Sequence, residues 1–168
     1  MVVWPSIAAF PSGRFLGRAY NISAGFHVLT VGNLIALLSI PHAFGLYVYR
    51  LLPSFFGLPW YGSRYVLTNR RLMELRNEFQ FLDRFPFVRF FYGVEVKSVE
   101  LDRFDAIAVD QLDGQDWFSA GDLVFTLAGV ETFRLDGVSR PETFRQTCVK
   151  SQTSFVGVKQ ALEAAPTS

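Results

Sequence analysis

The chain has 168 residues, half of them apolar, and a formal net charge of +1. This length suits one domain together with a membrane element. A nucleic-acid binder would show a basic face without an excess of acids elsewhere, so the nearly balanced charge argues against nucleic-acid binding. The single cysteine, Cys148, excludes an intramolecular disulfide.

The charged residues are distributed unevenly. Residues 1–63 carry three arginines and no acid, whereas residues 64–168 hold all 15 acids and the remaining 13 of the 16 Lys and Arg, so the two parts carry +3 and −2. Such a division predicts two environments. We expect an N-terminal arm over 1–20, membrane segments over 21–62, a folded domain over 63–152 and a tail with a short helix over 153–168.

A long uncharged segment accounts for the membrane expectation. No Asp, Glu, Lys or Arg occurs from Asn21 to Tyr49, which exceeds the roughly 20 residues that a transmembrane helix needs. Pro41 and Gly45 predict a turn between two spanning helices, at about 22–40 and 43–59. Arg50 would then lie inside the second helix, where a charge is costly.

A single tilted span is the alternative to this hairpin. It would cover about 23–50 and leave Arg50 at the membrane boundary. Trp60 and Tyr61 would follow it at the headgroup level, as membrane-interface aromatics do. The basic residues next to the segment place the later domain in the cytoplasm in both topologies. We therefore expect the protein in the cytoplasmic membrane.

After Tyr65 the pattern changes to short strands. "RYVLT" and "RLMELR" flank Asn69-Arg70, which predicts a hairpin turn. Further strands are expected at 94–101 (bulged or partly buried), 106–111, 122–127 and 132–136. The "SRPE" sequence of residues 139–142 predicts the start of a helix, with Phe144 and Cys148 on its apolar face.

The order of these elements resembles a known family. "YVLTNRRLMEL", "VELDRFDAIAVDQ", "GDLVF" and "GVSRPETFRQ", in that order, are similar to the bacterial membrane-anchored pleckstrin-homology-like (PH-like) family over about residues 25–150. The resemblance implies a membrane-anchored α+β protein. It would have a transmembrane hairpin or single span, then a small PH-like β-barrel capped by a C-terminal helix.

Two surfaces are candidate binding sites. The aromatic insertion at 79–93, "FQFLDRFPFVRFFYG", holds six of the 18 Phe and predicts a partner contact, with membrane seating or core packing as alternatives. The expected partner-binding residues are Phe85, Phe87, Phe90, Phe91, Tyr92 and, in the N-terminal arm, Trp4. The candidates for binding anionic lipid headgroups are Arg64, Arg70, Arg71 and Arg76, with flanking or salt-bridged charge as the alternative.

Catalytic and cofactor chemistry is poorly supplied. The only histidines, His27 and His42, lie in or beside the apolar segment and are weak candidates for a haem or pigment ligand. Cys148 is expected to pack in the core, and Asp113 and Asp116 to form a solvated turn rather than a calcium site. We expect no catalytic residue, no metal and no cofactor.

These observations predict a non-catalytic, membrane-anchored accessory subunit or scaffold of a larger membrane protein complex. Its cytoplasmic PH-like domain would contact other subunits, and its membrane segment would contact lipids. The abundance of interfacial aromatics favours a photosynthetic or respiratory complex slightly. The alternative is a PH-like module that binds anionic lipid headgroups at the cytoplasmic membrane face.

Overall fold

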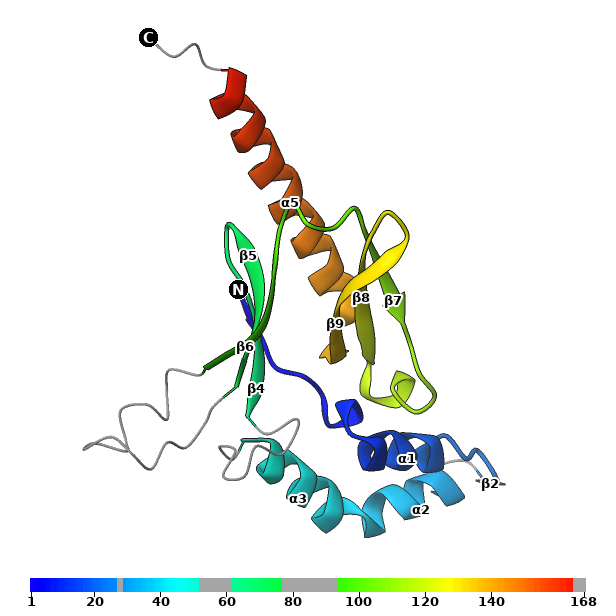
Figure 1. Cartoon of the computed structure of the whole chain (residues 1–168). Helices are drawn as coiled ribbons and strands as arrows, with labels where there is room; N and C mark the ends of the chain where they lie inside the picture. The colour runs from blue at the N-terminus through cyan, green and yellow to red at the C-terminus, as the bar shows by residue number, and fades with distance from the viewer. Residues whose placement is uncertain (27–28, 52–61, 77–93, 165–168) are drawn as a thin grey trace, which may run out of the picture.

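The structure, a computed structural model, describes residues 1–26, 29–51, 62–76 and 94–164. Within these residues the chain forms an α+β fold with two main antiparallel sheets (Figure 1). The N-terminal helices gather at one end of the sheets, and the C-terminal helix extends beyond the opposite end. The two ends therefore present different surfaces.

The first sheet has the strand order β1-β4-β5-β6. Its strands are β1 (Val2–Val3), β4 (Ser63–Leu67), β5 (Arg71–Arg76) and β6 (Val94–Glu100). The predicted hairpin at Asn69-Arg70 is confirmed, because β4 and β5 pair antiparallel. The register between β5 and β6 shifts at Glu74/Leu75, which confirms the irregular strand expected after residue 94.

The second sheet packs with the first sheet and the C-terminal helix around the core. The sheet has the order β7 (Ala106–Asp110), β8 (Ala120–Leu127), β9 (Val130–Ser139), and the short helix η2 (Asp116–Phe118) lies in the β7–β8 connection. Helix α5 (Pro141–Ala164) starts where the sequence predicts and continues without a break through the expected tail helix. Phe125, Phe144 and Cys148 are buried together in the core.

The expected closed barrel is wrong. The two sheets remain separate: β6 is paired only with β5 among the described strands, and the segment after β1 meets the second sheet at an isolated bridge between Pro5 and Val138. The sequence explains why this seam stays open. Strand β1 has two residues, and Pro5 has no N–H with which to extend the ladder.

The N-terminal part begins with η1 (Ile7–Ala9) and α1 (Pro11–Tyr20) and continues through the short ribbon β2 (Gly25–Phe26) and β3 (Leu29–Thr30). Helices α2 (Val31–Leu38) and α3 (Ile40–Leu51) follow. The predicted transmembrane hairpin and the single span are both wrong for the described residues, where no single helix is long and apolar enough to cross a bilayer. Only α2 and α3 taken together, bent by 55°, have the length and composition of a span.

Pro41 explains why the long helix does not form. It lies in the first turn of α3 and has no N–H to donate to the carbonyl of Leu37, four residues earlier in α2, so α2 does not continue into α3. Helices of 8 and 12 residues are about 12 and 18 Å long, against a hydrocarbon core of about 30 Å. The uncharged segment therefore becomes a bent pair.

Candidate functional site

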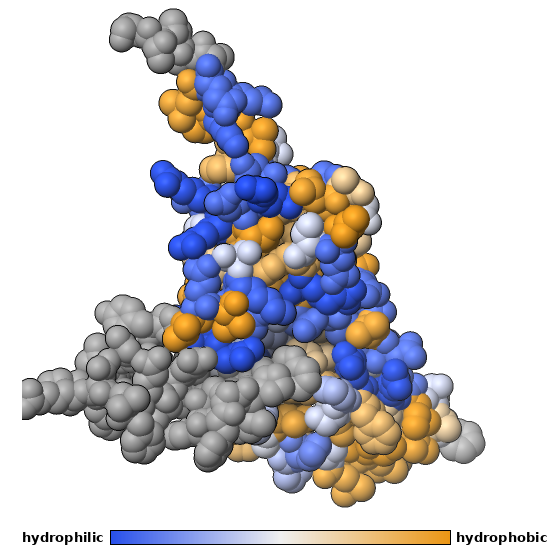
Figure 2. All heavy atoms as spheres, viewed as in Figure 1, coloured by the Kyte–Doolittle hydropathy of each residue, from blue (hydrophilic) through white to orange (hydrophobic). Residues whose placement is uncertain are grey.

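Exposed apolar side chains gather on the bent pair, at the end of the molecule opposite to the far end of α5 (Figures 1 and 2). We name this surface the apolar elbow. It consists of Leu34, Leu37, Leu38, Ile40, Phe44 and Tyr47. Leu38 is 80% exposed and Phe44 66%. Every residue from Asn33 to Tyr49 is at least partly exposed, although helices that are apolar on all faces are normally covered.

Local hydrogen bonds shape the elbow. The Thr30 hydroxyl accepts from the N–H of Asn33 (3.2 Å) and caps the start of α2. At the break, the Ser39 N–H donates to the Ile35 carbonyl and the Ala43 N–H donates to the Ser39 carbonyl, both at 2.9 Å. The Ser39 hydroxyl also lies against the Tyr20 hydroxyl of α1. The bend is therefore a hydrogen-bonded feature.

Three glycines join the elbow to the sheets. A Cβ on Gly32 would lie 2.2 Å from the Tyr20 carbonyl oxygen, so α2 packs directly on α1. A Cβ on Gly17 would lie 2.0 Å from the carbonyl oxygen of Gly114, so α1 in turn packs on the β7–β8 connection. Gly114 has φ +84°, which favours glycine. These backbone contacts hold the elbow at a fixed place.

A mainly apolar groove lies between the elbow and η2. Its volume is about 600 Å³, and Tyr20, Leu34, Leu37, Trp117 and Phe118 are among the residues that line it. The rings of Tyr20 and Trp117 meet edge to face with centroids 4.7 Å apart. Trp117 is half exposed at this position. The groove extends the uncharged surface toward the sheets.

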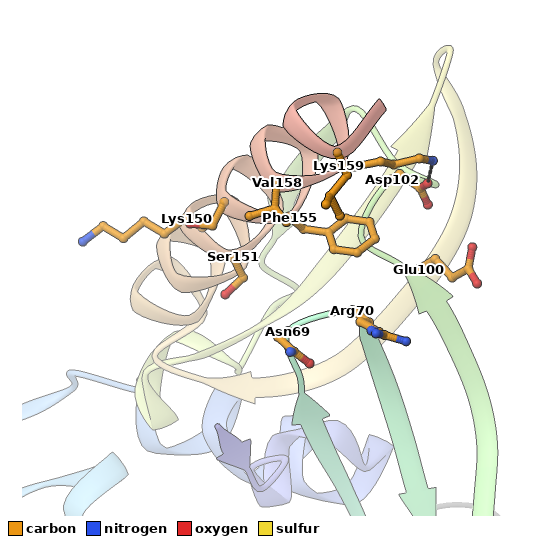
Figure 3. Close-up of a pocket in the computed structure, with 11 residues that line it drawn as sticks. Asn69, Arg70, Glu100, Asp102, Lys150, Ser151, Phe155, Val158 and Lys159 are labelled. Carbon is orange, nitrogen blue, oxygen red and sulfur yellow. Dashed lines mark hydrogen bonds and ion pairs between the residues drawn. The ribbon is translucent and has the colours of Figure 1, made fainter. Parts of the chain in front are cut away.

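A second hollow lies at the opposite end, between α5 and the β4–β5 turn (Figure 3). Its volume is about 790 Å³. Phe155 points into it, while the Lys159 ammonium donates to Asp102 at 2.7 Å. This contact lowers the pKa of Asp102 and raises the pKa of Lys159. The hollow mixes both charges with apolar side chains and indicates no single ligand class.

The structure separates the four arginines expected to bind lipid headgroups. Arg64 and Arg76 lie at the end of the β4–β5 hairpin where residues 63 and 76 pair, whereas Arg70 and Arg71 lie at its turn. Arg71 is ion-paired with Glu95 at 3.1 Å. Strands of five and six residues separate the two ends, so the four side chains do not form one binding site.

Two buried polar side chains, Arg50 of α3 and Tyr65 of β4, lie near each other. The Tyr65 hydroxyl donates to the Asp136 carbonyl at 2.9 Å and thereby links β4 to β9. Burial, and then the nearby Glu74 charge, raise the pKa of Tyr65. Arg50 is 6% exposed at the end of α3, and burial lowers its pKa to about 10. The Nε and Nη2 atoms of Arg50 have no hydrogen-bond partner among the described residues.

Sequence reasoning missed a second buried network. The Gln115 amide and the Gly137 N–H both donate to Oδ1 of Asp122, at 2.7 and 2.8 Å, and Arg134 lies 3.3 Å from its Oδ2. Gln115 and Asp122 are almost completely buried. An acid within an otherwise apolar strand, "GDLVF", was the available signal. The network fixes the β7–β8 connection, on which α1 packs.

The remaining candidates lie in structural positions. Asp113 is 3.6 Å from Arg18, and Asp116 accepts from the Asn21 amide at 2.8 Å, so both acids join the β7–β8 connection to the α1 region. Burial raises the pKa of Cys148 to about 12, which leaves little reactive thiolate at neutral pH. Within the described residues, no three His, Cys, Asp or Glu side chains are placed to hold a metal ion.

Other predicted residues are exposed or lie outside the described residues. His42 is exposed on α3, and Trp4 is 40% exposed. Eight of the predicted site residues lie outside the described ranges: His27, Trp60, Tyr61, Phe85, Phe87, Phe90, Phe91 and Tyr92. The expected roles of these eight residues stay predictions.

Comparisons with protein-family models, with curated proteins and with solved structures found no match. The resemblance to the PH-like family thus gains no support from them.

Proposed function

We propose that the protein is a non-catalytic accessory protein that works by binding, and that it docks on a larger membrane-associated complex through the apolar elbow. The observation that carries this proposal is the exposure of the elbow, where Leu37, Leu38 and Phe44 are each more than 60% exposed. Contiguous exposed apolar surface is rare in monomeric proteins and usually marks an interaction site.

The rigid connection behind the elbow supports a docking role. Backbone contacts at Gly32 and Gly17 link the elbow through α1 to the β7–β8 connection. A docking surface held in this way fixes the orientation of the sheets relative to whatever the elbow binds. The sheets would then present their own surfaces to other subunits, as a scaffold does.

The alternative, a module that binds anionic headgroups, has weaker support. Arg70 and Arg71 lie at the far end of the hairpin from Arg76, and Arg71 is already paired with Glu95. A phosphate group would therefore meet two of the expected arginines at most.

Co-purification in mild detergent tests the proposal. The double variant Leu37→Glu/Phe44→Glu places two charges on the elbow, and we expect it to lose the proteins that accompany the tagged wild type. Val130→Glu/Leu162→Glu is the matched control, because these apolar residues are similarly exposed elsewhere. The control should retain its partners. Equal retention by both double variants would contradict docking through the elbow.

The aromatic insertion offers an independent test of the same role. Polar substitution of Phe87 and Phe90 should also release the partners, while the melting temperature of the isolated protein stays unchanged. A collapse of the melting temperature would instead assign these two residues to the core.

A further inference from the structure

We propose that the direct ligand of the apolar elbow is the hydrocarbon of a lipid bilayer, into which α2 and α3 insert from one side without crossing. This inference rests on the proposed docking function and names the chemistry of its partner. It differs from the expected transmembrane anchor, because both helices enter and stay within one leaflet.

Charge complementarity favours hydrocarbon as the partner. From Asn21 to Tyr49 the chain has no charged residue, whereas protein interfaces are surrounded by a polar rim and are enriched in Arg. Arg50, the one charged residue of α3, is buried at 6% exposed and so does not lie on the elbow. A neutral apolar surface complements a neutral apolar phase.

Exposure on several sides distinguishes a bilayer from a protein groove. A protein groove usually receives one face of a helix, and an interfacial amphipathic helix keeps its charged face in water. Leu38, Ile40 and Phe44 are all more than 55% exposed, and no residue from Asn33 to Tyr49 is buried. Lipid chains can cover such helices from all free sides at once.

The backbone at the break is suited to an apolar medium. Unsatisfied N–H and C=O groups are costly in hydrocarbon. Around the bend, hydrogen bonds from Ser39 to Ile35 and from Ala43 to Ser39 continue the helical pattern, and Pro41 has no N–H to satisfy. The helix lengths of about 12 and 18 Å are comparable with one leaflet, about half of a 30 Å core.

Vesicle co-sedimentation of the purified full chain tests the inference. We expect binding to neutral phosphatidylcholine vesicles, with less than about a threefold change when phosphatidylglycerol or salt is added, because no charge drives insertion. Leu37→Glu/Phe44→Glu should weaken binding by at least about tenfold. Val130→Glu/Leu162→Glu should bind as the wild type does.

A site-specific probe provides the second measurement. An environment-sensitive fluorophore on Leu38→Cys should show a blue shift on addition of phosphatidylcholine vesicles, whereas the same fluorophore on Val130→Cys should not. Cys148 is buried and does not compete for labelling in the folded protein.

Several results would overturn the inference. These are failure of the wild type to bind neutral vesicles, equal binding by the elbow variant, or binding that requires anionic lipid and disappears at high salt. A dimer in solution that Leu37→Glu/Phe44→Glu dissociates would assign the elbow to a second copy instead.

Loss of protein partners by the elbow variant, when the wild type does not bind vesicles, would leave the proposed function standing and remove the lipid inference alone. Vesicle binding without any protein partner would keep the lipid inference and remove docking on a protein complex.

Discussion

The bent pair α2–α3 and the core between the second sheet and α5 are both rich in apolar residues, yet they have opposite exposure. Leu123 and Phe125 on β8 and Phe144 on α5 are buried, whereas Leu38 and Phe44 are exposed. The difference follows from patterning. The core elements have apolar faces that meet one another, while α2 and α3 are apolar on sides that no described element covers. Apolar content alone therefore does not tell the buried core from the exposed bent pair.

Truncation in the two regions should have very different effects on stability. Phe125→Ala removes a fully buried ring that packs edge to face on Phe104 and Phe133, and we expect a loss of about 3–5 kcal/mol in the free energy of unfolding. Leu38→Ala, at the exposed elbow, should change it by less than about 0.5 kcal/mol. Urea unfolding of both variants measures the two changes in the free energy of unfolding. Similar losses would show that the elbow is part of the folding core.

The buried network behind η2 should rank next. Asp122→Ala leaves the buried donors on Gln115 and Gly137 without their acceptor and removes one of the three carboxylates that Arg134 contacts, and we expect a loss of about 3 kcal/mol. Asp105→Ala is a comparison, because Asp105 accepts one backbone hydrogen bond at an exposed position. If Asp122→Ala were no worse than Asp105→Ala in urea unfolding, the network would not stabilise the fold.

The connection between the two regions can be tested at a glycine. Gly17→Ala would place a methyl group 2.0 Å from the Gly114 carbonyl oxygen, and this overpacking should cost about 1–3 kcal/mol. Gly45→Ala is the matched control on α3, where nothing lies within 4 Å of the new Cβ, and better helix propensity should stabilise the protein slightly. Thermal unfolding should separate the two variants, and an unperturbed Gly17→Ala would disprove the close packing of α1.

The effect that is smallest near neutral pH concerns the buried thiol. Burial raises the pKa of Cys148 from 9.0 to about 12, so between these values the unfolded chain loses the thiol proton first. The unfolded state then binds fewer protons than the folded one, and stability falls as pH rises from 9 to 12. Cys148→Ala should lack this component of the pH dependence. Identical slopes for wild type and variant above pH 9 would contradict the burial of the thiol.

Local signals in the sequence determined much of the β part and the start of α5. Alternating strands around Asn69-Arg70 were enough to predict the β4–β5 hairpin, and the "SRPE" sequence placed the first residue of α5. These features depend on residues within a few positions of one another. The uncharged segment from Asn21 to Tyr49 can also be read directly from the sequence. Its exposure, which makes it the candidate site, is a property of the structure.

Contacts between distant residues decided the rest. The contact of Ser39 with Tyr20 on α1 orients the bend that follows α2. Pro5 and Val138, more than a hundred residues apart in the sequence, form an isolated bridge between the sheets. Because proline has no N–H, this bridge does not extend into a ladder that would close a barrel. The lengths of the paired strands separate the arginines that looked like one cluster in the sequence. Each outcome depends on which distant segments pack against one another. The hydrophobic periodicity of a segment predicts its secondary structure but not its packing partner.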